Sequence, residues 1–382
     1  MTNRLLNLTL IFFFLLTSCS KEDSSDIAPS SSPTSNSQGN SGNQAGVITA
    51  GEWNDLDNWS YWENLIGTDD FKSMPQHWSI FNNNRVVVSV FASNETPVID
   101  ALVKLKRDGA TIFSSRTDNS GKAELWVDIF QKNTSVDFSN LSIDINNGEK
   151  EVSTVVPFAS GTNNIVLPLT TIDDKIEISL VVDATGSMGD ELEYLKTELL
   201  DVISRIKNAN PNSSVLTSSV FYRDEGDDYV TRVSNFTNDN NTTVNFIKNQ
   251  SAGGGGDFPE AVHSALDKAI NELQWSTNAR TRILFLILDA PPHHDNFVLS
   301  SIQNSIQIAS EKGIKIIPIT ASGIDKETEF LMRFLAISSN GTYVFITDDS
   351  GIGNSHLEAS VGEYQVEYLN NLMVRLINDY AE

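Results

Sequence analysis

The chain has 382 residues, enough for two folded domains with further segments, and its 40% hydrophobic residues can supply substantial cores. Its 26 Lys and Arg residues stand against 50 Asp and Glu residues, which gives a formal net charge of −24. Because phosphate binding needs clustered cations, this balance argues against a nucleic-acid partner and favours divalent cations or basic partners. The one cysteine excludes an intramolecular disulfide and every cysteine-based zinc ribbon.

The first 18 residues have the anatomy of a secretory signal. Arg4 precedes the apolar run LLNLTLIFFFLL (residues 5–16), and the small residues Thr17 and Ser18 follow it. Residues 16–19 (LTSC) resemble the lipobox of bacterial lipoproteins, which implies that Cys19 becomes the acylated first residue of the mature protein. An ordinary signal peptide with a chance cysteine, or a buried core helix, is the alternative.

This signal also predicts where the protein resides. Several acyl chains on Cys19 would anchor it firmly in a membrane, whereas no apolar stretch of about 20 residues could span one. The acidic run at residues 21–23 resembles the export signal of surface-exposed lipoproteins in some Gram-negative bacteria. We therefore expect a lipid-anchored protein of the cell envelope, at the outer membrane of a Gram-negative bacterium. The resemblance of the acidic run implies surface exposure, and a periplasmic orientation is the alternative.

Two segments precede the first predicted domain. Residues 19–46 are almost wholly Ser, Asn, Gly, Gln, Pro and acids, which predicts a disordered linker because so little apolar area can be buried. Residues 47–84 form a tryptophan-rich segment whose aromatic side chains predict packing against a neighbouring domain, with carbohydrate stacking as the alternative. Its tryptophans are Trp53, Trp59, Trp62 and Trp78.

Residues 85–170 alternate apolar and polar side chains around turn signals such as Asp108-Gly109 and residues 119–121. Short strands with frequent turns predict a small β-sandwich of about 85 residues. Residues 97–125 resemble the carboxypeptidase-regulatory or transthyretin-like sandwich, in which the TD-x-x-G-K turn recurs. No residue here carries chemistry, so we expect a spacer or adhesion module.

Residues 174–381 alternate buried strands with amphipathic helices. Strands are expected at residues 176–182, 215–222, 229–236, 282–288, 314–320 and 342–346, and helices at 188–206, 243–250, 258–273, 298–311 and 326–336. A long closing helix of static packing role is expected at about 356–380, with an apolar stripe made of Leu357, Val361, Tyr364, Tyr368, Leu372 and Leu376. The pattern predicts an α/β fold with a doubly wound, mostly parallel sheet, which binds ligands at the carboxyl ends of its strands.

Oxygen-bearing side chains follow three segments of this half. They come after the first strand, after a glycine run at residues 253–256, and after the strand at residues 282–288. The set is Asp183, Thr185, Ser187, Asp257 and Asp289. Three carboxylates and two hydroxyls at one sheet edge form an all-oxygen set, which suits Mg²⁺, Mn²⁺ or Ca²⁺.

At these residues the half resembles a von Willebrand factor type A domain, and Asp183-x-Thr185-x-Ser187 is similar to its metal-ion-dependent adhesion site. The family pattern is Asp-x-Ser-x-Ser, a Thr in a second loop and an Asp after the fourth strand. The resemblance implies that Thr185 and Ser187 supply the two hydroxyls and Asp289 the late carboxylate. Asp257 takes the place of the second-loop Thr, as in a hemicentin-like branch, and its carboxylate should strengthen cation binding.

Other interpretations of these residues stay open. Asp257, followed by Glu260 three residues later, is also a good helix start, so capping can replace or accompany a metal role. The acidic loop with Asp224, Asp227 and Asp228 could hold a second Ca²⁺, form a solvated loop or make a wall of the first site. His293 and His294 invite a zinc interpretation but lack a third ligand at a sensible spacing.

Enzyme signatures are missing from the sequence. A haloacid-dehalogenase phosphatase needs a second Asp where Thr185 stands, no P-loop motif occurs, and Ser187 lacks the G-x-S-x-G elbow. The sequence therefore predicts a lipid-anchored envelope protein that is not an enzyme and that binds a cation and, through it, a protein partner. A structural envelope scaffold with a purely stabilising metal is the alternative, and a hydrolase is a weaker one.

Overall fold

The computed structural model describes residues 44–382. The predicted signal peptide, Cys19 and most of the predicted linker lie outside the described residues. Within residues 44–382, no helix has the length and apolar character that crossing a membrane requires.

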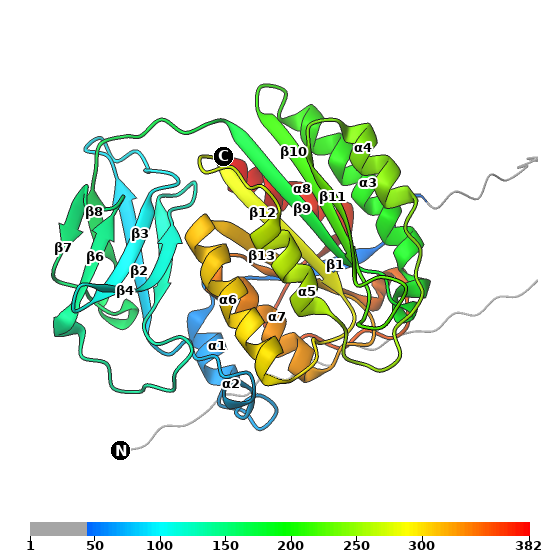
Figure 1. Ribbon diagram of the computed structural model, residues 1–382, viewed down its shortest axis with the longest axis horizontal. Helices are drawn as coiled ribbons and strands as arrows, with labels where there is room; N and C mark the ends of the chain where they lie inside the picture. The colour runs from blue at the N-terminus through cyan, green and yellow to red at the C-terminus, as the bar shows by residue number, and fades with distance from the viewer. Residues whose placement is uncertain (1–43) are drawn as a thin grey trace, which may run out of the picture. The chain divides into compact units, whose positions relative to one another are not determined.

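An eight-stranded sheet organises the carboxy-terminal half (Figure 1). Its order is β11 (Thr231–Thr237), β10 (Ser214–Tyr222), β9 (Lys175–Asp183), β12 (Thr281–Leu288), β13 (Ile314–Thr320), β14 (Tyr343–Ile346), β1 (Thr49–Trp53) and β15 (Val366–Tyr368). The five strands from β10 to β14 in this order are parallel, so their carboxyl ends meet at one edge. The predicted doubly wound, mostly parallel sheet is confirmed.

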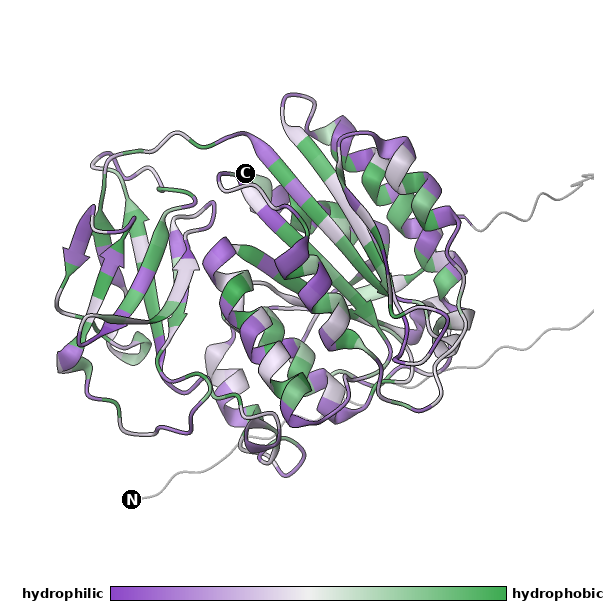
Figure 2. Ribbon diagram, in the orientation of Figure 1, coloured by the Kyte–Doolittle hydropathy of each residue, from purple (hydrophilic) through white to green (hydrophobic). Residues whose placement is uncertain are grey.

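Helices cover both faces of this sheet. They are α3 (Leu192–Ala209), α4 (Asn240–Lys248), α5 (Val262–Asp267) with a π-helical turn (Lys268–Glu272), α6 (Asn296–Lys312), α7 (Lys326–Ser338) and α8 (Leu369–Ala381). Alternate residues of β9 belong to different cores: Ile178 and Leu180 pack with α3 and α8, whereas Val181 packs in the core that contains α5, α6 and α7. Figure 2 shows the result as largely hydrophobic strands between helices of mixed hydropathy.

The amino-terminal strand β1 joins this sheet between β14 and β15, and it is antiparallel to both. Just before it, the buried carboxylate of Glu198 on α3 accepts hydrogen bonds from the Gly46 and Val47 N–H groups at 2.9 Å. The sequence did not predict this strand, because its pairing partners lie about 300 residues away.

The rest of the tryptophan-rich segment contains α1 (Trp59–Leu65) and α2 (Met74–His77). Trp62 is fully buried and stacks on Phe330 of α7, with ring centroids 5.7 Å apart. Trp59 lies 5.7 Å from Trp126 of the neighbouring β-sheet region. These tryptophans are therefore core anchors between neighbouring parts of the protein, as their composition predicted.

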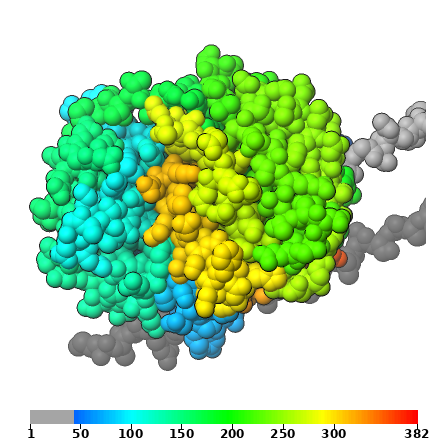
Figure 3. Space-filling model, viewed as in Figure 1, coloured from blue at the N-terminus to red at the C-terminus, as the bar shows by residue number. Residues whose placement is uncertain are grey.

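Two small sheets follow and share one hydrophobic core. Their orders are β5 (Lys122–Trp126), β2 (Arg85–Phe91), β8 (Asn163–Val166), and β4 (Ala110–Arg116), β3 (Leu102–Arg107), β6 (Leu141–Ile145), β7 (Lys150–Val152). This seven-stranded unit contacts the carboxy-terminal half through α6, and Figure 3 shows their surfaces meeting. At this junction the guanidinium of Arg282 donates two hydrogen bonds to the carboxylate of Asp100, at 2.8 and 3.0 Å.

Two helix predictions are wrong in part. The helix expected from residue 258 begins at Val262 with Ala261 as its N-cap, so Asp257 caps nothing. The closing helix begins only at Leu369, because β15 pairs with β1 immediately before it.

The predicted apolar stripe of the closing helix is divided accordingly. Leu372 and Leu376 are buried on α8 as expected. Leu357 and Val361 pack on the core from a loop, and Tyr364 is 42% exposed. The apolar residues that recur at helical spacing in the sequence thus belong to a loop, a strand and a helix in the structure.

Candidate metal centre

The centre begins where β9 ends, at Asp183, which is fully buried. Its Oδ1 accepts hydrogen bonds from the Thr185 N–H at 2.8 Å and from Thr185 Oγ1 at 2.7 Å. Thr185 Oγ1 in turn lies 3.1 Å from Ser187 Oγ. Asp183 Oδ2 is buried and has no hydrogen-bond partner within residues 44–382. The loop after β9 thus brings one carboxylate and two hydroxyls together and leaves one oxygen unsatisfied.

The glycine run closes over this loop. The Gly186 N–H donates to the Gly254 carbonyl oxygen at 3.1 Å, and the Gly253 N–H donates to the Ala184 carbonyl oxygen at 3.0 Å. Gly255 has a φ of +70°, and a Cβ there would lie 2.8 Å from Glu260 Oε1 and 3.2 Å from Thr185 Cβ. Glycine is therefore required for the loop to fit between Thr185 and Glu260.

Asp289 approaches the same place from the next strand of the sheet, directly after β12. Its side chain is 4% exposed, and its Oδ1 is a second buried carboxylate oxygen without a partner in the described chain. The structure therefore brings Asp289 to the same sheet edge as Asp183, as the sequence predicted.

Glu260 is a third acid at this centre, and the sequence analysis considered it only as part of a helix start. It is 2% exposed, its Oε2 has no partner among the described residues, and its N–H donates to the Pro291 carbonyl oxygen at 2.9 Å. The GGGGDFPE sequence contains two acids, Asp257 and Glu260. Glu260 stands immediately before the buried residues around the start of α5, and this position was the signal in the sequence that could have identified it.

The electrostatics of the three buried carboxyl groups agree with this geometry. Burial raises the pKa of Asp183 to about 6. Burial and the charge of Asp183 raise the pKa of Asp289 to about 7. Burial, followed by the charges of Asp183, Asp224 and Asp289, raises the pKa of Glu260 to about 9. The three carboxyl groups thus share one poorly solvated space, where the ionisation of one disfavours the ionisation of the others. A bound cation would stabilise their ionised forms.

These residues fit a hard divalent cation. Three buried carboxyl groups each offer an unpartnered oxygen, and Thr185 and Ser187 add hydroxyls beside them. Within residues 44–382, no three His, Cys, Asp or Glu side chains are grouped so that they could hold a metal by themselves. Hydroxyls and water would therefore complete the shell, which is typical of Mg²⁺.

The remaining predicted ligands lie elsewhere. The side chain of Asp257 is exposed, and in the described structure it makes no hydrogen bond to the other predicted ligands. Asp228 is also exposed. Asp224 pairs with His293, with 2.7 Å between Oδ1 and Nε2, and Asp227 Oδ2 accepts the Gly255 N–H at 2.8 Å. The acidic loop thus forms a wall of the centre, which was one of the three alternatives for it.

The two histidines point to different partners. His293 pairs with Asp224, whereas His294 stacks on His77 with ring centroids 3.8 Å apart. The sequence offered no third ligand for a zinc site, and the two rings take separate roles in the fold.

Comparison with known proteins finds a family match over the residues that form this centre. Residues 177–354 match the family model of the von Willebrand factor A domain. The predicted resemblance is therefore confirmed for this part of the chain. The metal-site assignment and the resemblance of the sandwich stay predictions.

Curated relatives share only part of their length with this chain. A putative ariadne-like RING finger protein of Acanthamoeba polyphaga mimivirus is 33% identical over 127 residues, which cover 32% of this chain and 12% of that protein. The alpha-protein kinase vwkA of Dictyostelium discoideum is 24% identical over 209 residues, which cover 54% of this chain and 33% of that protein. The chain thus spans no more than a third of either relative.

Two solved structures also resemble this chain. The conserved hypothetical protein BatB from Bacteroides thetaiotaomicron is 14% identical with a TM-score of 0.37, over 54% of this chain and 98% of that one. An aerotolerance-related membrane protein from Bacteroides fragilis is 15% identical with a TM-score of 0.34, over 53% of this chain and 99% of that one.

Proposed function

We propose, from the match of residues 177–354 to the von Willebrand factor A domain, that this protein binds a divalent cation and, through it, a protein partner. Domains of this family commonly mediate protein interactions. The observation that carries the proposal is the set of unpartnered oxygens on three buried carboxyl groups at one sheet edge. They belong to Asp183, Asp289 and Glu260.

Each residue has a distinct role in the proposed site. Thr185 and Ser187 offer neutral hydroxyl oxygens, while the three carboxylates supply negative charge directly or through water. Asp227 holds the glycine run in place through the Gly255 N–H. A bound Mg²⁺ would act as a Lewis acid with an open coordination position, which an oxygen of the partner can fill. Mn²⁺ and Ca²⁺ are the other candidates.

We propose a binding role and not an enzymatic one, in the cell envelope of a Gram-negative bacterium. The lipobox-like residues 16–19 support an anchor at Cys19 in the outer membrane, and the acidic run after it supports surface exposure. A Cys19→Ala variant should leave the membrane fraction, and wild-type protein found wholly in the soluble fraction would contradict the anchor.

Calorimetric titration tests the metal site. Mg²⁺, Mn²⁺ and Ca²⁺ are each titrated into the EDTA-treated and dialysed protein, and into three variants of equal charge change. We expect Asp183→Asn to abolish binding, Glu260→Gln to weaken it at least tenfold, and the exposed control Asp257→Asn to stay within twofold. Equal binding by wild type and Asp183→Asn would contradict the site.

A second measurement separates adhesion from a scaffold. Partners crosslinked to the surface protein are recovered in Mg²⁺ and in EDTA. Loss of partners in EDTA supports binding through the cation. Partners that persist in EDTA while the melting temperature falls would favour the structural scaffold with a purely stabilising metal.

A further inference from the structure

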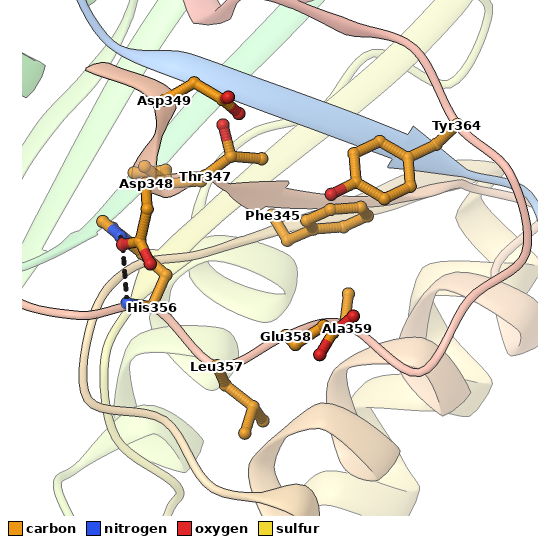
Figure 4. Close-up of a pocket in the computed structure, with 10 residues that line it drawn as sticks. Phe345, Thr347, Asp348, Asp349, His356, Leu357, Glu358, Ala359 and Tyr364 are labelled. Carbon is orange, nitrogen blue, oxygen red and sulfur yellow. Dashed lines mark hydrogen bonds and ion pairs between the residues drawn. The ribbon is translucent and has the colours of Figure 1, made fainter. Parts of the chain in front are cut away.

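A cavity of about 430 Å³ opens at the carboxyl end of β14 (Figure 4). It lies on the same sheet edge as Asp183 and Asp289, because β9, β12, β13 and β14 are parallel neighbours. It is lined by the end of β14, the turn that contains Asp348 and Asp349, and the loop that precedes β15. Its volume suits a single side chain or a small molecule.

One wall of the cavity is aromatic. The rings of Phe345 and Tyr364 meet edge to face, with centroids 4.8 Å apart, and Figure 4 shows the Tyr364 ring beside Phe345. On the adjacent strand, a Cβ at Gly51 would lie 2.6 Å from both rings, so the absence of a side chain there makes room for them. Tyr364 nevertheless stays 42% exposed, so part of this wall is open to a ligand.

The cavity also carries negative charge that is compensated only in part. Of its three acids, Asp348 pairs with His356, with 2.8 Å between Oδ1 and Nδ1. Lys326 Nζ donates to the Glu358 carbonyl oxygen at 3.0 Å, but no Lys, Arg or His within residues 44–382 pairs with the carboxylate of Asp349 or Glu358. Both acids line the cavity together with Tyr364, and burial and their charges raise the pKa of the Tyr364 hydroxyl. Two carboxylates without a basic partner in the described chain thus share the cavity with the aromatic wall.

We propose that this cavity binds a basic side chain of a protein partner, with arginine preferred. A guanidinium is attracted to aromatic faces and pairs with carboxylates, and its aliphatic stem can lie along apolar surface. A metal ion fits less well, because one of the three acids is already paired with His356 and one wall is aromatic. An anion would be repelled by the acids.

The cavity and the metal centre are physical neighbours. Glu191 links them: its Oε1 lies 3.0 Å from His356 Nε2 and accepts the Ser322 N–H at 3.1 Å, and its charge helps to raise the pKa of Asp289. One partner could therefore reach both places along the sheet edge. The basic side-chain site does not depend on a cation, so it stands or falls separately from the proposed function.

The experiment measures peptide binding to the full chain in EDTA, by saturation-transfer NMR. The probes are Ac-Gly-Arg-Gly-NH₂, the same peptide with neutral citrulline in place of arginine, and agmatine. We expect the arginine peptide to bind at least tenfold more tightly than the citrulline peptide. The Asp349→Asn/Glu358→Gln variant should lose at least tenfold, and Tyr364→Ala should also weaken binding.

A matched control removes the same charge elsewhere. Asp70→Asn/Glu95→Gln changes two exposed acids remote in sequence from the cavity, and it should bind within twofold of wild type. Equal binding of the arginine and citrulline peptides, or no loss in the Asp349→Asn/Glu358→Gln variant, would overturn the proposal. Agmatine carries the same guanidinium group and should bind as well, so a failure to bind agmatine would overturn guanidinium recognition. The acids are exposed, so an unchanged melting temperature should accompany each result.

Discussion

Buried carboxylates occur in two regions of this protein, with opposite surroundings. Where the amino-terminal region meets the carboxy-terminal half, two buried carboxylates have basic partners: Asp100 pairs with Arg282 at 2.8 Å, and Asp55 pairs with Arg333 at 2.6 Å. At the sheet edge, Asp183 and Asp289 have none. Burial costs free energy in both regions, but only the first offsets that cost within the described chain. The comparison shows that a buried carboxylate without a basic partner marks the place where an external cation is expected.

Breaking a pair at the junction should have the largest effect. Arg333 is fully buried and contacts the buried acids Asp55 and Glu329, so Arg333→Met would leave two carboxylates poorly compensated. We expect a loss of about 3–5 kcal/mol in the free energy of unfolding, measured with urea. Arg205→Met, which removes a half-buried ion pair with Asp201, should cost less than about 1 kcal/mol. Similar losses in both variants would contradict the comparison.

Supplying the missing charge at the sheet edge should have the next largest effect. Mg²⁺ at about 100 times its Kd should raise the free energy of unfolding by about 2.7 kcal/mol. The Arg333→Met variant should gain the same amount, because the two regions are independent, whereas Asp183→Asn should gain nothing. A melting temperature that ignores millimolar Mg²⁺, Mn²⁺ and Ca²⁺ would exclude the metal centre.

The pH dependence without metal should be smaller. Free carboxyl groups titrate near pH 4, whereas Asp183, Asp289 and Glu260 have pKa values raised to about 6, 7 and 9. Between these limits the folded state holds more protons than the unfolded chain, so stability falls as the pH rises. We expect the free energy of unfolding to fall steadily from pH 5 to pH 9 in EDTA and to fall less with Mg²⁺. A flat profile in EDTA would contradict this electrostatic account.

Removing one acid should sharpen the comparison further. In EDTA at pH 8, Glu260→Gln should raise the free energy of unfolding by about 1 kcal/mol, because a carboxyl with a pKa of about 9 must take up a proton on folding at that pH, whereas an amide need not. The same variant should respond less to Mg²⁺ than wild type. A stabilised metal-free protein that keeps its full Mg²⁺ response would show that Glu260 only repels and does not bind.

The smallest effect is expected at Asp257. It is exposed and caps no helix, so Asp257→Ala should change the free energy of unfolding by less than about 0.5 kcal/mol, with or without Mg²⁺. A loss of about 1 kcal/mol would instead indicate a cap that the structure does not contain. Urea unfolding in EDTA and in Mg²⁺ distinguishes the two.

The sequence predicted those parts of the fold that a short stretch of residues determines by itself. The apolar run of β9 ends at Asp183, and the Asp-x-Thr-x-Ser spacing follows it directly, so both the strand and the loop were visible. Glu260 was not, because Asp257 and Glu260 stand close together in the sequence, and only the folded path of the chain shows which of them is buried. Pairing between distant segments likewise determines where the last helix begins. Because β15 pairs with β1, part of the segment with helical spacing forms a strand.

The position of β1 has a mechanical consequence. Ala50 pairs with Ile346, and the Thr347 N–H donates to the Thr49 carbonyl oxygen, so the amino-terminal chain enters at the edge that carries Asp183 and Asp289. If a partner bound at this edge and the amino-terminal chain were pulled apart, the force would run from strand to strand across β12, β13 and β14. It would not act along the length of the strands. β1 resists extraction because β14 and β15 hold it on both sides. Single-molecule pulling on residue 44 should therefore detach a partner before the core of the domain unfolds, and prior unfolding of the core would contradict this path of force.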